Sequence, residues 1–293
     1  MLKDPNQLYL ELREKYWAAC NRPWEDHEFK KHRDEIAAVR QELSACITDL
    51  LKLGRAGNIE ACAHLGDAYM SRQGVDRDRA KAIEWFRKAA EQGHVRAIVR
   101  LGTALMLPDF PETAVEGIGW LHRAADTGDA AAMVSLGFAY RDGKGTVPDF
   151  EKAEFWFTKA FKEGELRSMV HIGRLHAWET ESPEKALPWL RRAADAGFED
   201  SYWALVTLCS DPKSQFYSPG EAVHWLKAIA NSLKFSAPRA LVQLARMTRD
   251  GHGTNQDLGL AQTYIETALS LDAPKEVKKE AERLLSDLNS SFL

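Results

Sequence analysis

A pair made of one large aliphatic residue and one small residue recurs along this chain at steps of 33 to 39 residues. Its six occurrences are Leu65-Gly66, Leu101-Gly102, Leu136-Gly137, Ile172-Gly173, Leu205-Val206 and Leu244-Ala245. A period of this length is typical of repeat proteins, in which each unit buries its apolar face only against its neighbours. The period therefore indicates a repeat architecture before any helix or strand is predicted.

Three further markers recur in phase with this pair. The first is an aromatic residue, found as Trp85, Trp120, Trp156, Trp189, Trp225 and Tyr264. The second is a doublet of small residues, found as Ala89-Ala90, Ala124-Ala125 and Ala193-Ala194. The third is a closing glycine, found as Gly93, Gly128, Gly164 and Gly197. Together the markers predict about six repeats over residues 57–271, of which the last two are degenerate.

Each repeat is predicted to fold as two helices joined by a turn. In the first repeat, the apolar residues Ala61, Leu65 and Ala68 recur at steps of four and three, which places them on one helical face. Glycine inside a helix costs about 1 kcal/mol relative to alanine. We therefore interpret Gly66 and its equivalents as positions where two helices touch, with the repeated tryptophan filling the space between hairpins.

The repeat resembles a known family. The run Gly-x3-Ala-x3-Leu-Gly-x2-Tyr, then Gly-x-Gly, then Ala-x2-Trp-x3-Ala-Ala is best kept in repeats one and three. It is similar to the Sel-one-like repeat, a branch of the tetratricopeptide-like superfamily. The resemblance implies an all-α fold, a right-handed α/α superhelical solenoid whose concave face is made by the first helix of each repeat.

The two flanks lie outside the repeat. Residues 1–53 read as an N-terminal helical cap of two helices, from Pro5 to about Ala19 and from about Trp24 to Leu53, with Trp17 facing inward. Residues 274–293 read as a C-terminal capping helix, because the open ends of a solenoid must be covered. A dimerisation or docking role for the N-terminal helices is the alternative.

Composition favours a cytoplasmic protein. The net charge of −4 gives no reason to expect nucleic acid as the main ligand. The N-terminal sequence lacks the apolar segment of a signal peptide, and no apolar run approaches the length that spans a bilayer. Four cysteines, Cys20, Cys46, Cys62 and Cys209, show no paired spacing, so we expect reduced thiols. The partner is therefore not expected to be a membrane.

Fragments of catalytic motifs occur but none is complete. His27 and His32 are five residues apart, which on a helix does not direct both toward one metal ion. Ser182-x-x-Lys185 and Ser210-x-x-Lys213 have the serine–lysine spacing of penicillin-recognising enzymes without the motifs that complete that site. Ser182 is better explained as a helix N-cap. We predict no enzyme activity, no cofactor and no metal.

The first helices of the repeats are predicted to carry the binding surface. If the resemblance fixes the register, the concave face has seven arginines against the three acidic residues Glu60, Asp67 and Asp200. The candidate partner-binding residues are Arg96, Phe138, Arg141, Arg167, Arg174, Trp203, Arg239, Arg246 and Arg249. Arginine and tryptophan dominate interaction hot spots. The alternative is that the arginines only solvate an exposed face and that Trp203 packs inside its own hairpin.

These features predict a non-catalytic scaffold or adaptor that holds an acidic segment of a protein partner in the concave groove. A narrower hypothesis is an immunity-type protein that inhibits a toxin. Two alternatives come from other classes, namely a hydrolase of the serine–lysine type and a nucleic-acid-binding protein that uses the same arginines.

Overall fold

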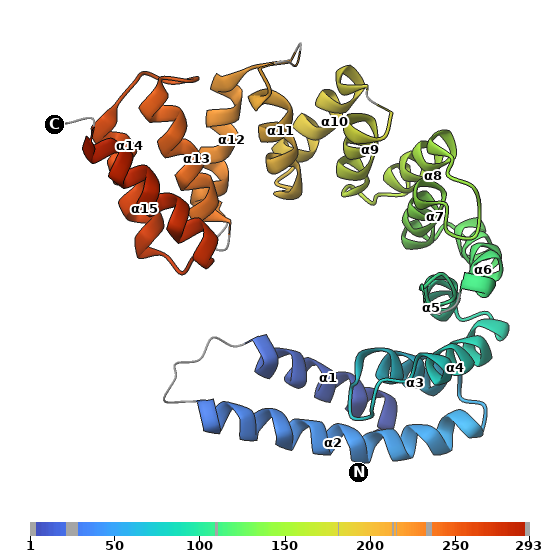
Figure 1. Cartoon of the computed structure of the whole chain (residues 1–293). Coiled ribbons are helices and arrows are strands. Elements are labelled where there is room, and N and C mark those ends of the chain that lie inside the picture. The colour runs from blue at the N-terminus through green and yellow to red at the C-terminus, as the bar shows by residue number, and fades with distance from the viewer. Residues whose placement is uncertain are drawn as a thin grey trace. The chain divides into compact units, whose positions relative to one another are not determined.

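The computed structural model is all-helical over the residues that it describes, which are 4–21, 29–108, 111–180, 182–212, 214, 216–232 and 236–290. This part of the chain contains fifteen α-helices and no strand. The chain divides into two compact units, an N-terminal unit of residues 1–163 and a C-terminal unit of residues 164–293. The predicted all-α solenoid is confirmed, since helix hairpins follow one another along both units (Figure 1).

The N-terminal unit holds two flanking helices and three hairpins. Its helices are α1 (Pro5–Asn21), α2 (Phe29–Arg55), α3 (Ile59–Ser71), α4 (Arg79–Glu91), α5 (Val95–Leu105), α6 (Ala114–Asp126), α7 (Ala130–Asp142) and α8 (Phe150–Lys162), with a short 3₁₀ turn, η2 (Pro111–Thr113), before α6. Each helix packs on the next, from α1 on α2 to α7 on α8. One continuous apolar core follows from this packing.

The C-terminal unit holds three hairpins and a final helix. Its helices are α9 (Ser168–Trp178), α10 (Pro183–Asp195), α11 (Asp200–Ser210), α12 (Pro219–Ser232), α13 (Ala237–Asp250), α14 (Leu258–Ser270) and α15 (Lys275–Ser290). We call the first helix of each hairpin an A-helix (α3, α5, α7, α9, α11 and α13) and the second a B-helix (α4, α6, α8, α10, α12 and α14). No helix in the described ranges is long and apolar enough to cross a membrane.

The glycine in the middle of each well-kept A-helix is a contact point between the two helices of a hairpin. A Cβ at Gly66 or Gly137 would lie 2.4 Å from the ring of Phe86 or Phe157, respectively. The ring over the glycine thus belongs to the residue after the repeated tryptophan. The tryptophan reaches the preceding element instead, since Trp156 meets His122 of the previous B-helix with ring centroids 5.3 Å apart.

The glycine of the inter-helix turn is a second contact point, and it joins one repeat to the element before it. A Cβ at Gly145 would lie 2.5 Å from the backbone carbonyl of Ala114, the first residue of α6. A Cβ at Gly253 would lie 2.2 Å from the carbonyl of Pro219, the first residue of α12. Both glycines also have positive φ angles, of 70° and 75°, that other L-residues adopt with strain.

The first repeat uses the same joint against a helix that is not part of any repeat. The turn glycine Gly74 rests on α2, where an added Cβ would lie 2.8 Å from the backbone carbonyl carbon of Leu43. The buried side of α2 includes Leu43, Ile47 and Leu50. Therefore α2 receives the first repeat in the way that a B-helix receives the repeat after it.

Aspartates begin the B-helices of the three repeats that keep the glycine-rich turn. Asp78, Asp149 and Asp257 each lie four residues after the turn glycine. Their carboxylates accept a hydrogen bond from the backbone N–H three residues further on, at 3.0, 2.9 and 2.8 Å respectively. Such N-caps satisfy amides that would otherwise lack a partner at the helix start.

In each unit one ion pair joins two successive B-helices. Arg87 of α4 donates to both carboxylate oxygens of Glu116 in α6, at 2.8 and 3.0 Å. Arg191 of α10 binds Glu221 of α12 through two nitrogens, with Nε donating to Oε1 at 2.8 Å and Nη2 donating to Oε2 at 2.7 Å. In both cases the arginine follows a repeated tryptophan by two residues and the glutamate precedes the next one by four.

The flanking helices pack on the repeats next to them. Helix α1 lies against α2 and α3, and Tyr9 and Leu12 are buried there. Trp17, expected to face inward, is 56% exposed, because it lies on the side of α1 that no other helix covers. At the other end α15 packs on α13 and α14 through Ala281, Leu284 and Leu288.

Candidate protein-binding surface

The nine candidate residues lie on A-helices or directly before one, in two separate groups. Arg96, Phe138 and Arg141 belong to α5 and α7 of the N-terminal unit. The other six belong to the C-terminal unit, on α9, α11 and α13 or directly before α9; they are Arg167, Arg174, Trp203, Arg239, Arg246 and Arg249. Each unit therefore presents its own A-helix surface.

Most of the candidate arginines already have an acidic partner. Five of the seven form an ion pair; the pairs are Arg96–Asp67, Arg141–Asp142, Arg167–Asp200, Arg246–Glu280 and Arg249–Asp250. Only Asp67 and Asp200 among these carboxylates were expected on the concave face from the sequence. Two of the others are next in sequence to their arginine, whereas Glu280 comes from the C-terminal helix, outside the repeats. The candidate surface is thus closer to charge balance than the sequence indicated.

Arg174 and Arg239 differ from the other five because no acidic residue of the described chain pairs with them. Each guanidinium lies over a tryptophan ring instead. Arg174 lies 5.5 Å from the ring centroid of Trp178, and Arg239 lies 5.5 Å from that of Trp203. Both arginines are exposed. Trp178 was missed in the sequence, although its spacing of four from Arg174 on a helix is a signal that predicts such a contact.

Trp203 has two environments. One part of the ring packs on the apolar core of the C-terminal unit, and the ring also receives Arg239 from the A-helix of the next repeat. The side chain therefore links two A-helices, α11 and α13, within this unit. Packing inside its own hairpin, the alternative considered from the sequence, describes only part of its contacts.

Phe138 and Arg141 form a smaller group on α7. The guanidinium of Arg141 lies 4.9 Å from the ring centroid of Phe138 while its Nε donates to Asp142 at 2.7 Å. The ring of Phe138 also packs edge-on against Phe157 of α8, with centroids 5.2 Å apart. This arrangement holds both side chains in place from two sides.

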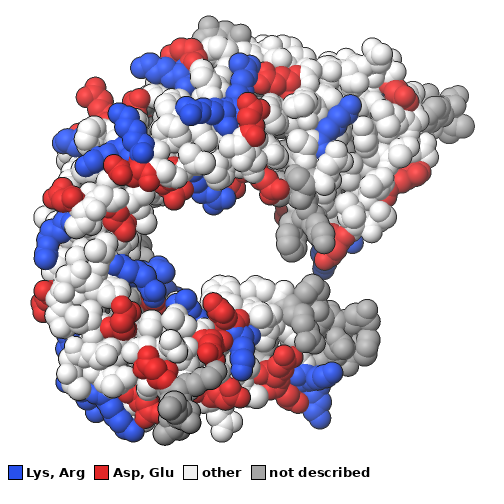
Figure 2. All heavy atoms as spheres, turned by 180° about the vertical axis from the view of Figure 1, so that it is seen from behind, with Lys and Arg blue, Asp and Glu red and all other residues white. Residues whose placement is uncertain are grey.

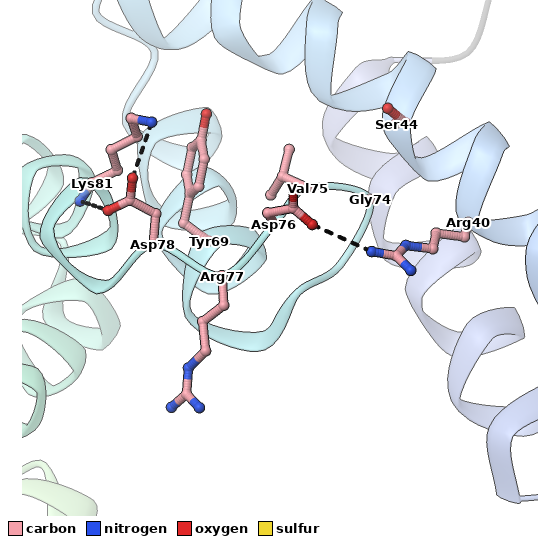
Figure 3. Close-up of a pocket in the computed structure, with 9 residues that line it drawn as sticks. All are labelled: Arg40, Ser44, Tyr69, Gly74, Val75, Asp76, Arg77, Asp78 and Lys81. Carbon is pink, nitrogen blue, oxygen red and sulfur yellow. Dashed lines mark hydrogen bonds and ion pairs between the residues drawn. The ribbon is translucent and has the colours of Figure 1, made fainter.

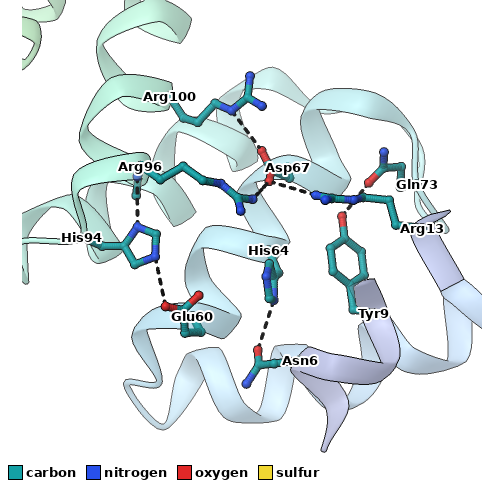
Figure 4. A network of polar contacts seen from close by, with 11 residues as sticks. Asn6, Tyr9, Arg13, Glu60, His64, Asp67, Gln73, His94, Arg96 and Arg100 are labelled. Carbon is teal, nitrogen blue, oxygen red and sulfur yellow. Dashed lines mark hydrogen bonds and ion pairs between the residues drawn. The ribbon is translucent and has the colours of Figure 1, made fainter. Parts of the chain in front are cut away.

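In the N-terminal unit, helix α1 covers part of the A-helix surface of the first repeat (Figure 4). The hydroxyl of Tyr9 donates to Oε1 of Gln73 at 2.6 Å, and Asn6 lies 3.2 Å from Nδ1 of His64. Burial lowers the pKa of His64 to about 4, so this imidazole is neutral near pH 7. Burial also raises the pKa of Tyr9, which stays protonated and can donate.

Asp67 lies at the centre of the same network and is surrounded by three arginines (Figure 4). Arg96 binds its Oδ2 directly. Arg13 of α1 lies 3.7 Å from Oδ2, and Nε of Arg100 lies 3.4 Å from Oδ1. Only 10% of the Asp67 side chain is exposed. Neither Arg13 nor Arg100 was among the residues selected from the sequence, because Arg13 lies outside the repeats and Arg100 is not at a position that was expected on the concave face.

A polar hollow, separate from the Asp67 network, lies between α2 and the turn of the first repeat (Figure 3). Arg40 approaches Asp76 at 3.7 Å across it, and Lys81 pairs with the N-cap Asp78 at 3.0 Å. Gly74 forms the floor where it touches α2. Arg40, Asp76, Asp78 and Lys81 thus serve the joint with α2 or the cap of α4, and Arg77 lines the hollow as well.

The charged residues of the surface are mixed in sign. On the face shown in Figure 2, lysine and arginine side chains are interspersed with aspartate and glutamate side chains. Nucleic-acid binding draws its affinity from basic side chains gathered against phosphates. This face offers no such gathering.

The serine–lysine fragments show no catalytic geometry. Ser182 is at the N-cap position of α10, but its hydroxyl donates to the carbonyl of Thr180 at 3.1 Å instead of capping the helix. Lys185 is exposed, and Lys213 lies outside the described residues. His27 lies outside them as well. Within the described ranges, no group of three His, Cys, Asp or Glu residues is placed to hold a metal ion.

Comparison with known proteins decides the family. The model of the Sel1 repeat matches residues 59–94, 109–129, 130–165, 176–198 and 238–272, together more than half of the chain. The chain belongs to the Sel1 repeat family. Sel1 repeats suggest a scaffold for protein–protein interaction. The matched ranges include the repeat around α13 and α14 and leave out residues 199–237.

Relatives of this Sel1 repeat protein differ from it widely in sequence. An uncharacterized protein of Neisseria meningitidis serogroup B is 26% identical over 84% of this chain, and the chain spans 56% of that protein's length. The crystal structure of a Sel1 repeat protein from Oxalobacter formigenes covers 93% of this chain and 100% of its own, with 21% identity and a TM-score of 0.57. An immunity protein from Pseudomonas aeruginosa covers 77% of this chain and 82% of its own, with 13% identity and a TM-score of 0.38.

Proposed function

We propose that this Sel1 repeat protein is a non-catalytic scaffold that binds an acidic segment of a partner protein on the A-helices of its C-terminal unit. The observation that carries the proposal is the pair of exposed arginines, Arg174 and Arg239, that lie on tryptophan rings and have no acidic partner in the described chain. Arg167 and Trp203 extend the same surface.

A stacked arginine is well prepared to bind a carboxylate. The ring restricts the guanidinium plane, so less side-chain freedom is lost when a ligand binds. The edge of the guanidinium keeps its N–H donors, which match the two oxygens of a carboxylate. Arg174 and Arg239 meet these conditions from α9 and α13, with Trp203 on α11 between them in sequence.

The paired arginines of the candidate set have a secondary role in this proposal. Arg246 and Arg249 already bind Glu280 and Asp250, so a ligand would have to displace an internal carboxylate. Because that exchange cancels much of the gain, we expect these two residues to contribute less than Arg174 and Arg239. Their charge still favours an acidic partner over a basic one.

The test uses the full chain and synthetic probes. Fluorescein-labelled peptides rich in Glu and Asp are compared with peptides of the same sequence carrying Gln and Asn, and binding is measured by anisotropy at low salt. We expect the Arg174→Ala/Arg239→Ala variant to bind the acidic peptides at least about tenfold more weakly than wild type, as for loss of charged hydrogen bonds at an interface.

The control is the Lys185→Ala/Lys227→Ala variant, which removes two exposed charges from B-helices of the same unit. It should bind like wild type, and all variants should keep the melting temperature. Equal binding by wild type and the Arg174→Ala/Arg239→Ala variant, or equal binding of acidic and amide peptides, contradicts the proposal. Affinity capture with the two baits then identifies the natural partner as the protein that only wild type retains.

We place this interaction in the cytoplasm. Cys46, Cys62 and Cys209 are buried free thiols and Cys20 is an exposed one. Burial raises the pKa of Cys46 and of Cys209 to about 11, which keeps these thiols protonated. Reduced thiols are typical of proteins in reducing compartments. Cell fractionation with an antibody to the protein tests the assignment.

An immunity-type role is a narrower form of the same proposal, in which the acidic segment belongs to a toxin. It is tested by co-expression with toxins encoded beside the gene, where rescue of growth that depends on Arg174 and Arg239 supports it. No observation favours the hydrolase or the nucleic-acid alternative, since the Ser182 hydroxyl bonds to a carbonyl and the face shown in Figure 2 mixes basic with acidic side chains.

A further inference from the structure

The arginines around Asp67 outnumber what one carboxylate can bind. Arg96 occupies Oδ2, while Arg13 and Arg100 stay at 3.7 and 3.4 Å, beyond good hydrogen-bond distance. A guanidinium has five N–H donors, so three arginines carry more donors than the about four lone-pair sites of one carboxylate can accept. Donors of Arg13 and Arg100 therefore remain for a further anionic group.

These donors face two neighbouring cavities of the N-terminal unit. The first, of about 460 Å³, is lined by Arg13 and Trp17 of α1, by Asp67 and by Arg100. The second, of about 360 Å³, lies between α5 and α7 and has Arg96 and Arg100 on its wall. Arg100 lines both cavities and therefore lies on a wall that they share; we refer to the two cavities together as the groove on the A-helices α3, α5 and α7.

The walls of this groove suit a peptide. Val99 and Ala131 give it apolar surface, and Thr103 and Ser135 give it hydroxyl groups. At the α1 end the ring of Trp17, 56% exposed, lies on the wall as an apolar platform. Arg100 is 57% exposed and can turn toward a ligand without leaving the groove.

The charge balance distinguishes between anionic ligands. Besides Asp67, the groove is lined by Glu14 near α1 and by Asp129, whose carboxylate caps α7 by accepting from Ala132 N–H at 2.7 Å. The three carboxylates balance the three arginines of the groove as a whole, so the excess of positive charge is confined to the three guanidinium groups around Asp67, and a phosphate dianion would meet the other two carboxylates as well. Asp67 itself shows that a carboxylate fits among the three guanidinium groups.

We infer that this groove is a second acidic-residue site, which binds one Asp or Glu side chain of an extended partner segment through Arg100 and Arg13. Asp67 acts there as an internal competitor, because it holds the same arginines when no partner is bound. The inference rests on the proposed function for the nature of the partner, but its residues belong to the other unit and act independently of Arg174 and Arg239.

The test is made in the full chain carrying Arg174→Ala/Arg239→Ala, so that the C-terminal site does not contribute. Labelled peptides containing one Glu near a Leu or Trp are compared with Gln versions by anisotropy. We expect Arg100→Ala to weaken binding of the Glu peptides about tenfold, and Asp67→Asn to strengthen it severalfold because the competitor loses its charge.

The matched control is Arg77→Ala, which removes an exposed arginine of the same unit outside the groove. It should leave peptide binding unchanged. Circular dichroism and melting temperature verify that each variant is folded; since Arg100 is largely exposed, its loss should not affect folding.

Three results overturn the inference: no binding by any Glu peptide, equal binding of Glu and Gln peptides, or affinity that is unaffected by Arg100→Ala. Tighter binding of a phosphoserine peptide than of the Glu peptide would also overturn it, in favour of a phosphate site. If peptide affinity is unchanged by Arg174→Ala/Arg239→Ala but lowered by Arg100→Ala, the proposal for the C-terminal unit is contradicted and the inference for this groove is supported.

Discussion

At the scale of single residues, glycine sets how closely the helices of this protein approach. Gly137 lies under the ring of Phe157, and an added methyl group would come within 2.4 Å of it. Gly119, in α6, has nothing within 4 Å of the same position and is exposed. Both residues are glycines inside a helix, but Gly137 is packed against a ring and Gly119 has open space where a side chain would begin.

Alanine at these two positions should therefore change stability in opposite directions. We expect Gly137→Ala to destabilise by about 1–3 kcal/mol, because the ring must leave its place in a close-packed core. Gly119→Ala should stabilise by up to about 1 kcal/mol through helix propensity alone. Urea unfolding followed by circular dichroism measures both, and equal effects of the two substitutions would show that Phe157 adjusts without cost.

Residues of the candidate surface were predictable only in part. The spacing of the repeat places Arg174, Trp203 and Arg239 on A-helices, where the structure also has them. It does not show which carboxylate a long side chain reaches, so the pairing of Arg246 with Glu280 from the terminal helix was missed. The contribution of Arg13 to Asp67 was missed for the same reason, because it depends on how α1 lies on α3.

At the scale of helices, side-chain caps are kept in some repeats and absent from others. Aspartate caps begin α4, α8 and α14, whereas the first residue before α9 or α11 makes no side-chain cap bond. The Arg191–Glu221 brace joins α10 to α12, next to the uncapped α11.

The brace should make stability depend on pH. The bidentate bonds from Arg191 hold the pKa of Glu221 below its usual range. A carboxyl group with a lowered folded-state pKa adds stability above its unfolded pKa of about 4.3, and that stability is lost as the pH falls through the folded value. We expect Arg191→Gln to lower the free energy of unfolding by about 1 kcal/mol near neutral pH, for a half-exposed arginine.

Urea unfolding of wild type and Arg191→Gln over a pH series measures this effect. The difference between them should shrink as the pH falls below about 4, where Glu221 becomes protonated in both states. Lys185→Gln, on the same helix, is the control and should show no such pH dependence. A difference that stays constant across the series would mean that Arg191 acts through packing of its aliphatic part.

At the scale of the whole molecule, stability is built from contacts between neighbours. The apolar core of the N-terminal unit is continuous from α1 to α8, and the C-terminal unit has its own clusters, the last of which joins α13, α14 and α15. In such a chain a substitution that loosens the packing at one end should destabilise only the helices near that end. The period of the sequence predicted this arrangement because it depends on local spacing, and local spacing is what a sequence displays.

Truncation of a terminal side chain tests the locality. Leu288 of α15 is fully buried against the last hairpin. Leu288→Ala should cost about 2–5 kcal/mol in the cluster around it, as for other buried leucines. Hydrogen exchange should then accelerate in α13, α14 and α15 and stay unchanged in α3 and α4. A uniform acceleration over both units would show that the chain unfolds as one cooperative body.

The joint made by the turn glycine bears on how such a chain changes its length during evolution. Each repeat that keeps the turn brings its own receiving surface for the helix before it, as Gly145 does for Ala114 and Gly253 for Pro219. Gly74 shows that the helix before it need not come from a repeat, since α2 serves equally well. A gene duplication that adds one such unit would thus supply both a turn glycine and a B-helix for the new junctions. A deletion of one unit would bring together a turn glycine and a B-helix that can form the same contact.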